Sequence, residues 1–169
     1  FIDEKGPVLY NNFGRFVQLY KSANKLRGHE MNVLFFLKPK SEVVYLYEDF
    51  SLRQALEKME YYRYSAVPII NRQGNYVGTI TEGDLLWNIK DKYLLDLHKA
   101  EDIPLTKIDR RWYNDPVNVN CEIEDLVLTS MNQNFVPVID DNQIFIGIIT
   151  RKDIIEYCYN RFKESEERE

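Results

Sequence analysis

Two threonine–aspartate pairs stand at the same spacing in two similar stretches of the chain. Thr81 and Asp84 lie in GTITEGD, and Thr150 and Asp153 lie in GIITRKD. A carboxylate accepts two hydrogen bonds at once, which suits the vicinal hydroxyls of a ribose. Each threonine falls near a predicted helix start, where backbone amides and the helix dipole attract phosphate. The pairs are therefore candidate nucleotide-binding groups, unless the threonines are only N-caps and the aspartates first-turn residues that complement the dipole.

The two pairs belong to a longer internal repeat. Residues 66–86 align with residues 135–155 without a gap, at an offset of 69. Self-similarity of this kind indicates two copies of one supersecondary unit. Identical residues fall at Val67 and Val136, Pro68 and Pro137, Ile70 and Ile139, Gly78 and Gly147, Ile80 and Ile149, Thr81 and Thr150, and Asp84 and Asp153.

Each copy predicts the order β-α-β-β-α. The helix before the first hairpin starts at Leu52, because Ser51 and Gln54 form a capping-box pattern, and its counterpart starts at Ile123. From these helix starts to the shared proline there are 16 residues in the first copy and 14 in the second, so the second helix or its exit is two residues shorter. β-branched and aromatic residues predict strands over 43–47, 66–70 and 76–80, and over 116–119, 135–139 and 144–149.

One such unit of roughly 60 residues would bury only about 60% of its chain surface and would be marginally stable alone. We therefore expect an α+β fold in which the two copies pack sheet to sheet with pseudo-two-fold symmetry, with binding sites in the clefts between them. Leu9, Phe13 and Phe16 follow helical spacing, so an N-terminal amphipathic helix is expected as well. The expected division is an N-terminal extension over 1–30, repeats over 31–92 and 109–160, a linker over 93–108 and an acidic tail over 161–169.

The Val-Pro strands and the two G-h-h-T-x-x-D motifs, where h is hydrophobic, resemble the CBS (cystathionine beta-synthase) domain family, paired as a Bateman module over about residues 34–158. The resemblance implies that AMP, ADP, ATP or S-adenosylmethionine binds in the clefts. It also implies that the motif aspartate binds the ribose hydroxyls and that the threonine contacts ribose or phosphate. By position, one implied site contains Thr81, Asp84, Val43, Val44, Ser65 and Ala66, and the other contains Thr150, Asp153, Val117, Val119, Asn134 and Phe135.

The two implied sites differ in charge between the threonine and the aspartate. The second has Arg151 and Lys152 where the first has Glu82 and Gly83. A cation neutralises phosphate and a carboxylate repels it, so a single phosphorylated ligand would favour the second site. Five other basic residues either add phosphate contacts or are simply solvated at the ends of elements. They are Lys38, Lys40, Arg63, Arg110 and Arg111.

These features predict a non-catalytic regulatory module with no metal site and no required cofactor, which takes an adenine nucleotide as regulatory ligand and signals to an unknown partner protein. No hydrolase, zinc or P-loop motif is present. A net charge of −5 disfavours nucleic acid as a partner, and no apolar run reaches the ~18 residues that a membrane span needs. Cys121 and Cys158 predict free thiols and a cytoplasmic setting.

The resemblance also implies a homodimer through the helices that follow the motifs. Two alternatives stay open for function. One is a protein-interaction or dimerisation module whose clefts are empty, and the other is a protein that binds cyclic di-AMP. Beside Trp87 on the first of these helices, Leu85, Leu86 and Ile89 are expected to be core or interface residues, and the counterpart helix carries Ile154, Ile155 and Tyr157.

Overall fold

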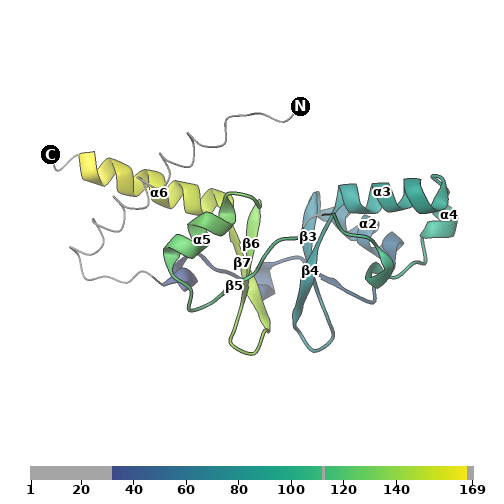
Figure 1. Cartoon of the computed structure of the whole chain (residues 1–169), viewed down its shortest axis with the longest axis horizontal. Helices are drawn as coiled ribbons and strands as arrows, with labels where there is room; N and C mark the ends of the chain where they lie inside the picture. The colour runs from purple at the N-terminus through teal and green to yellow at the C-terminus, as the bar shows by residue number, and fades with distance from the viewer. Residues whose placement is uncertain (1–31, 112, 167–169) are drawn as a thin grey trace. The chain divides into compact units, whose positions relative to one another are not determined.

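A computed structural model describes residues 32–111 and 113–166, which form an α+β fold with two sheets (Figure 1). The fold below is that of the compact unit Val33–Glu169. The amphipathic helix expected within residues 1–30 lies outside the described residues.

The first repeat holds a three-stranded sheet in the order β2-β3-β4. Strand β2 is parallel to β3, and β3 is antiparallel to β4, as a β-α-β-β-α unit requires. The strands are β2 (Leu46–Tyr47), β3 (Ala66–Ile70) and β4 (Tyr76–Thr81), and the helices are α2 (Leu52–Tyr62) and α3 (Glu82–Tyr93). Helix α2 begins as predicted, because Gln54 N donates to Ser51 Oγ and Ser51 N donates to Gln54 Oε1.

The second repeat holds a four-stranded sheet in the order β1-β7-β6-β5. Strand β1 comes from the start of the first repeat, ahead of β2, yet it pairs antiparallel with β7, with Lys38 opposite Ile148 and Pro39 opposite Gly147. The strands are β1 (Lys38–Pro39), β5 (Val117–Asn118), β6 (Phe135–Ile139) and β7 (Phe145–Thr150), and the helices are α5 (Ile123–Ser130) and α6 (Arg151–Glu166). Helix α6 therefore continues into the stretch that was expected to be an acidic tail.

The segments around β1 and between the repeats form short helices. The 3-10 helices η1 (Val33–Phe36) and η2 (Lys40–Glu42) flank β1, whereas α4 (Leu97–Ala100) and η3 (Leu105–Lys107) lie between the repeats. None of the helices within residues 32–111 and 113–166 is long and apolar enough to cross a membrane.

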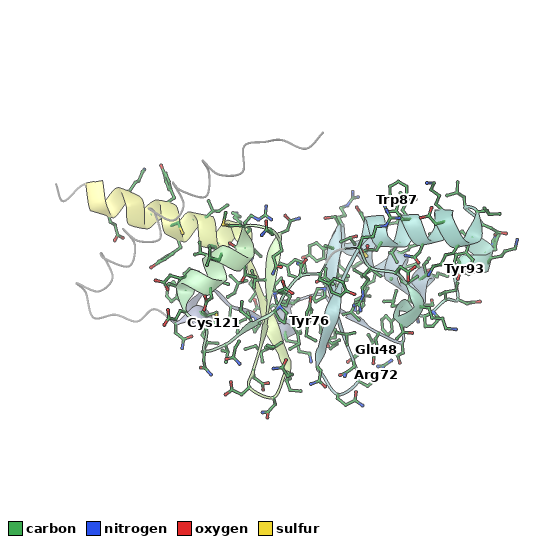
Figure 2. The ribbon with its side chains drawn as sticks, viewed as in Figure 1. Glu48, Arg72, Tyr76, Trp87, Tyr93 and Cys121 are labelled. Atoms are coloured by element: carbon green, nitrogen blue, oxygen red, sulfur yellow. The ribbon has the colours of Figure 1, made fainter. Side chains whose placement is uncertain are left out.

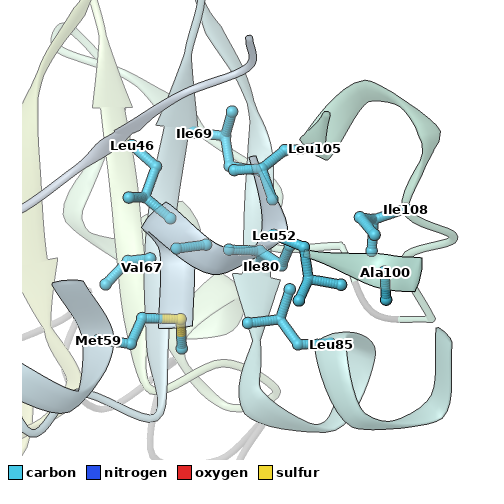
Figure 3. Close-up of a cluster of buried hydrophobic side chains, with 11 residues drawn as sticks. Leu46, Leu52, Met59, Val67, Ile69, Ile80, Leu85, Ala100, Leu105 and Ile108 are labelled. Carbon is cyan, nitrogen blue, oxygen red and sulfur yellow. The ribbon is translucent and has the colours of Figure 1, made fainter. Parts of the chain in front are cut away.

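The core of the first repeat draws on both the repeat and the connecting segment. Leu46, Leu52, Ile80 and Leu85 are completely buried and come from strands and helices of the repeat (Figure 3). The connecting segment adds Ala100, Leu105 and Ile108 to the same cluster. Each large aliphatic side chain buried in this way contributes about 1.5–3 kcal/mol. The connecting segment is thus held against the first repeat by its apolar side chains.

The two repeats meet at equivalent residues, as the predicted pseudo-two-fold symmetry requires. Asn75 and Ile144, which are 69 positions apart, form an antiparallel bridge with each other. The rings of Tyr76 and Phe145, also 69 positions apart, stack with centroids 6.1 Å apart, and Figure 2 shows Tyr76 between the two sheets. A contact between equivalent residues of two copies is what a two-fold axis between them produces.

Two expected strands are shorter than predicted. In the first copy only Leu46–Tyr47 is strand, because Val43 N donates to Lys40 O at the end of η2 and Lys58 Nζ donates to the Tyr45 carbonyl at 2.9 Å. In the second copy the strand ends at Asn118, whose carbonyl accepts from Cys121 N in a turn. Local hydrogen bonds therefore shorten both strands, although Val119 N still donates to Ile139 O of the neighbouring strand.

Candidate functional site

Both carboxylate oxygens of Asp84 accept hydrogen bonds from other groups of the chain. Its Oδ2 accepts from Thr81 N at 3.0 Å and from Thr81 Oγ1 at 2.7 Å, and Asp84 N donates back to Thr81 Oγ1 at 3.1 Å. Its Oδ1 accepts from Arg111 N at 2.9 Å. The residue is 1% exposed. Thr81 and Asp84 therefore form a buried capping box at the start of α3.

Residues 109–111 cover this first motif. Asn88 holds the segment in place, since its Nδ2 donates to Asp109 O at 2.8 Å and its Oδ1 accepts from Asp109 N at 3.1 Å. The Arg110 guanidinium donates to Val77 O at 3.1 Å and lies so close to Gly78 that a Cβ there would overlap it. The segment occupies the surface that the first motif would otherwise offer to a ligand.

Asp153 is held by fewer groups than Asp84. Its Oδ2 accepts from Thr150 Oγ1 at 2.5 Å and lies 3.4 Å from Lys38 Nζ. Its Oδ1 accepts no hydrogen bond among residues 32–111 and 113–166. The side chains of Asp153 and Lys38 are 28% and 50% exposed. One carboxylate oxygen thus remains available to a ligand.

The charge state of Asp153 follows from its surroundings. Partial burial alone would raise the pKa of Asp153. The hydrogen bond from Thr150 and the positive charge of Lys38 oppose burial and outweigh it, so the pKa of Asp153 is lowered from its ordinary value. Asp153 is an anion at neutral pH, as an acceptor for hydroxyl groups should be.

The segment that crosses the second motif differs from the one that crosses the first. Leu46 and Val117 are 71 positions apart, so Lys38, Pro39 and Lys40 correspond to Asp109, Arg110 and Arg111. Over the second repeat this segment is the strand β1, and its backbone approaches β7 so closely that a Cβ on Gly147 would overlap Lys38 O. No amide of β1 donates to Asp153, whereas Arg111 N donates to Asp84.

The predicted residues just before the Val-Pro pairs lie beside the two motifs. Ala66 pairs with Thr81 across the first hairpin, and Phe135 pairs with Thr150 across the second. Ser65 O accepts from Glu82 N at 3.0 Å, as its counterpart Asn134 O accepts from Arg151 N at 2.9 Å. In both repeats the structure brings these residues together with the threonine of the motif.

The predicted first-strand residues fall at different places in the two repeats. Val43 lies outside β2, at the end of η2, where its N donates to Lys40 O, and Val44 packs on the core of the first repeat. In the second repeat Val117 pairs with Val138, three residues or about 10 Å along β6 from Phe135. Val119 lies one step further, since its N donates to Ile139 O. Val117 and Val119 are therefore not brought to Thr150.

Two residues beside the second motif escaped the sequence analysis. The 71-residue offset makes Asn114 and Asp115 the counterparts of Val43 and Val44. Asn114 Nδ2 donates to Phe135 O at 3.0 Å, and the Asp115 backbone exchanges two hydrogen bonds with the Gln133 side chain. The sequence carries a signal for them, because the helix starts Leu52 and Ile123 are 71 positions apart, whereas the shared prolines are 69 apart.

The cations named from sequence have different surroundings. Arg151 Nε donates to Ser130 O at 2.9 Å and to Gln133 O at 3.0 Å, so it closes the end of α5. Lys152 is exposed on α6. Arg111 pairs with Asp91 at 3.1 Å, and Lys40 lies 5.4 Å from the ring centroid of Tyr45. Arg63 ends α2 in the left-handed conformation.

The family model of the CBS domain matches residues 36–91 and 114–160. These two segments coincide with the two β-α-β-β-α copies and cover more than half of the chain. The chain belongs to the CBS domain family.

Relatives and solved structures agree with this assignment. An A-adding tRNA nucleotidyltransferase from Aquifex aeolicus is 28% identical over 155 residues, which are 90% of this chain and 18% of the relative. The chain spans less than half the length of the curated relatives that it matches. The solved structure of CbpB in complex with c-di-AMP has a TM-score of 0.69 at 21% identity, covering 90% of this chain and 99% of that one. CBSX2 in complex with AMP has a TM-score of 0.60 at 20% identity, covering 76% and 96%.

Proposed function

We propose that this chain is a regulatory module that binds one adenine nucleotide, of the AMP, ADP or ATP type, at Thr150 and Asp153 of the second repeat. The observation that carries the proposal is the difference between the two motif aspartates. Asp153 is partly exposed and has one carboxylate oxygen without a hydrogen bond among the described residues, whereas Asp84 is buried and has both oxygens bonded.

The proposed contacts follow from the residues around Asp153. The ribose hydroxyls donate to Asp153, and Thr150 contacts the ribose or the phosphate. The adenine rests near Asn134 and Phe135, which lie beside Thr150. The ligand class rests on membership of the CBS domain family and on the two similar proteins solved with AMP and with c-di-AMP.

The proposed action is regulation without catalysis. A ligand shifts a conformational equilibrium only if it binds two states with different affinity, and the partner protein reads the favoured state. The proposed repeats are residues 31–92 and 109–160, joined by 93–108, and the proposed setting is cytoplasmic, in keeping with two free cysteines.

A homodimer through α3 and α6 is part of the proposal. Leu86 and Trp87 are exposed on α3, and Figure 2 shows Trp87 on the outer surface of this helix. Ile155 and Tyr159 are exposed on α6. Apolar side chains that remain exposed on two helices supply a surface of the kind that dimers bury.

Thermal melting with adenosine, AMP, ADP, ATP, S-adenosylmethionine and cyclic di-AMP in turn tests the proposal. A ligand at 100 times its dissociation constant stabilises the fold by about 2.7 kcal/mol, or roughly 5–10 °C for a domain of this size. A shift with an adenine mononucleotide supports the proposed function. A shift with cyclic di-AMP alone would replace the ligand, and no shift with any of them would favour an interaction module with empty clefts.

A further inference from the structure

We propose that Lys38 makes the second-repeat site selective for phosphorylated nucleotides over the bare nucleoside. The inference rests on the proposed function and names the chemical class of its ligand. It also makes the site a composite one, because Lys38 lies at the start of the first repeat in the chain and reaches the motif of the second.

The backbone of Lys38 is held against the second repeat while its side chain stays accessible. Lys38 pairs with Ile148 in the sheet, and the close approach of its carbonyl oxygen to Gly147 allows no side chain there. Its side chain is half exposed, and the ammonium lies 3.4 Å from Asp153 Oδ2. Exposed ion pairs of this kind contribute little to stability, so the ammonium can turn toward a phosphate at small cost.

In this arrangement both the Lys38 ammonium and the Asp153 carboxylate can bind a ligand. Lys38 approaches the oxygen of Asp153 that Thr150 already binds, so Oδ1 stays open to hydroxyl groups. An ammonium has three donors, and only one is needed for the contact with Asp153. A phosphate brought near Asp153 without a cation would meet an uncompensated carboxylate and be repelled. Lys38 removes that repulsion and supplies charge-assisted hydrogen bonds.

The first repeat has the opposite charge at the corresponding position. There the counterpart of Lys38 is Asp109, whose carboxylate already binds Lys92 at 2.8 Å. In the second repeat Arg151 donates through Nε to Ser130 O and Gln133 O, which anchors it to the end of α5. Lys38, in contrast to Arg151, thus forms an ion pair with the motif aspartate Asp153.

The test is isothermal titration of adenosine, AMP and ATP into the wild-type chain and into the variants Lys38→Met and Lys38→Arg. Methionine keeps the length and the backbone pairing of Lys38 and removes its charge. We expect Lys38→Met to weaken AMP and ATP roughly tenfold, as the loss of one charge-assisted contact should, and to change adenosine affinity by less than about twofold. Lys38→Arg should keep the preference for AMP over adenosine.

Two matched variants separate Lys38 from charge in general. Lys40→Met removes a cation from the same segment, whose ammonium lies over the ring of Tyr45 instead of at Asp153. Lys152→Met removes the exposed cation next to Asp153 in sequence. Both should leave the ratio of adenosine to AMP affinity unchanged.

Three results would overturn the inference. Equal weakening of adenosine and AMP by Lys38→Met would give Lys38 a purely structural role, and a loss of the ratio in Lys152→Met but not in Lys38→Met would move selectivity to α6. If the wild-type chain binds none of the three compounds, the proposed function itself fails, which is a result distinct from the other two.

Discussion

Asp84 and Asp153 occupy the same position in two copies of one structural unit, but within residues 32–111 and 113–166 both oxygens of Asp84 accept hydrogen bonds and Oδ1 of Asp153 accepts none. Asp84 is buried under residues 109–111 and accepts three hydrogen bonds from the chain. Asp153 lies beside β1, which pairs with β7 through its backbone and sends only the Lys38 side chain to the carboxylate. The segment that crosses each motif, and not the motif itself, therefore decides whether the aspartate has a structural role or remains open to a ligand.

The largest expected difference between the two aspartates is in folding stability. Asp84→Ala should lower the free energy of unfolding by about 3 kcal/mol, because it removes a buried carboxylate and leaves the partly buried Thr81 N and Arg111 N without this acceptor. Asp153→Ala should cost less than about 1 kcal/mol, because its partners are a threonine hydroxyl and an exposed lysine. Urea unfolding of both variants measures the difference, and equal losses would contradict the comparison.

Alanine substitutions of the two motif glycines should differ in whether a second substitution can restore the lost stability. Gly147→Ala places a Cβ against the backbone oxygen of Lys38 and should destabilise the fold by about 2 kcal/mol. Gly78→Ala meets the guanidinium of Arg110, which can move, and in addition places an alanine at a φ of +148°.

Adding Arg110→Ala should therefore restore part of the stability lost in Gly78→Ala. Adding Lys38→Ala to Gly147→Ala should restore none, because the clash is with the backbone. Thermal melts of the four variants measure both effects. Rescue of Gly147→Ala by Lys38→Ala would show that β1 is not held to β7 by its backbone.

Much of this architecture was predictable from local sequence. The bounds of β3 and β6 and the capping box of α2 agree with the prediction, because β-branched runs and the Ser51–Gln54 pair act over a few residues. The pairing of β1 with β7 was not predicted, since a two-residue strand carries little pattern and its partner lies more than 100 positions away.

The difference between the two motifs was only partly predictable. The charges of Arg151 and Lys152 favour the second copy in the sequence, but in the structure Arg151 closes the end of α5. The burial of Asp84 depends on Arg111 N, a backbone group 27 positions away that no side-chain pattern reports. Ser65, Ala66, Asn134 and Phe135 were located beside the motifs because hairpin pairing is local, whereas Val117 and Val119 were displaced by a register that the two-residue gap shifts.

A smaller effect is expected where the two copies touch. Tyr76 differs from its counterpart Phe145 by a hydroxyl that donates to Asn114 O at 2.9 Å and lies 2.8 Å from Thr79 Oγ1. Tyr76→Phe makes the stacked pair symmetric and should cost about 1 kcal/mol in urea unfolding. No loss of stability would mean that this hydroxyl does not contribute to the contact between the copies.

Burial also raises the pKa of Tyr76 to about 12. The stabilisation linked to this neutral phenol is present below the ordinary tyrosine pKa near 10 and is lost as pH rises through about 12. Absorbance titration at alkaline pH should therefore show one late-titrating phenol that disappears in Tyr76→Phe.

The smallest effect concerns the charge of Asp153. Because its pKa is lowered in the folded state, its stabilising contribution is present above the ordinary carboxyl pKa and is lost as pH falls through the lowered value. Thr150→Val should raise the pKa of Asp153, since it removes the hydrogen bond that favours the anion. NMR titration of the Asp153 carboxyl carbon measures the change in pKa, and an unchanged midpoint would show that Thr150 does not lower the pKa of Asp153.

Calorimetric titration of AMP into the wild-type chain and the paired variants Asp84→Asn and Asp153→Asn tests most directly whether the nucleotide binds at Asp153 and not at Asp84. Both variants replace a carboxylate by an amide of the same shape, so they compare the two positions without a change in size. We expect one AMP bound per chain in the wild type and in Asp84→Asn, and a loss of affinity in Asp153→Asn. Binding that survives in Asp153→Asn and vanishes in a folded Asp84→Asn would contradict it.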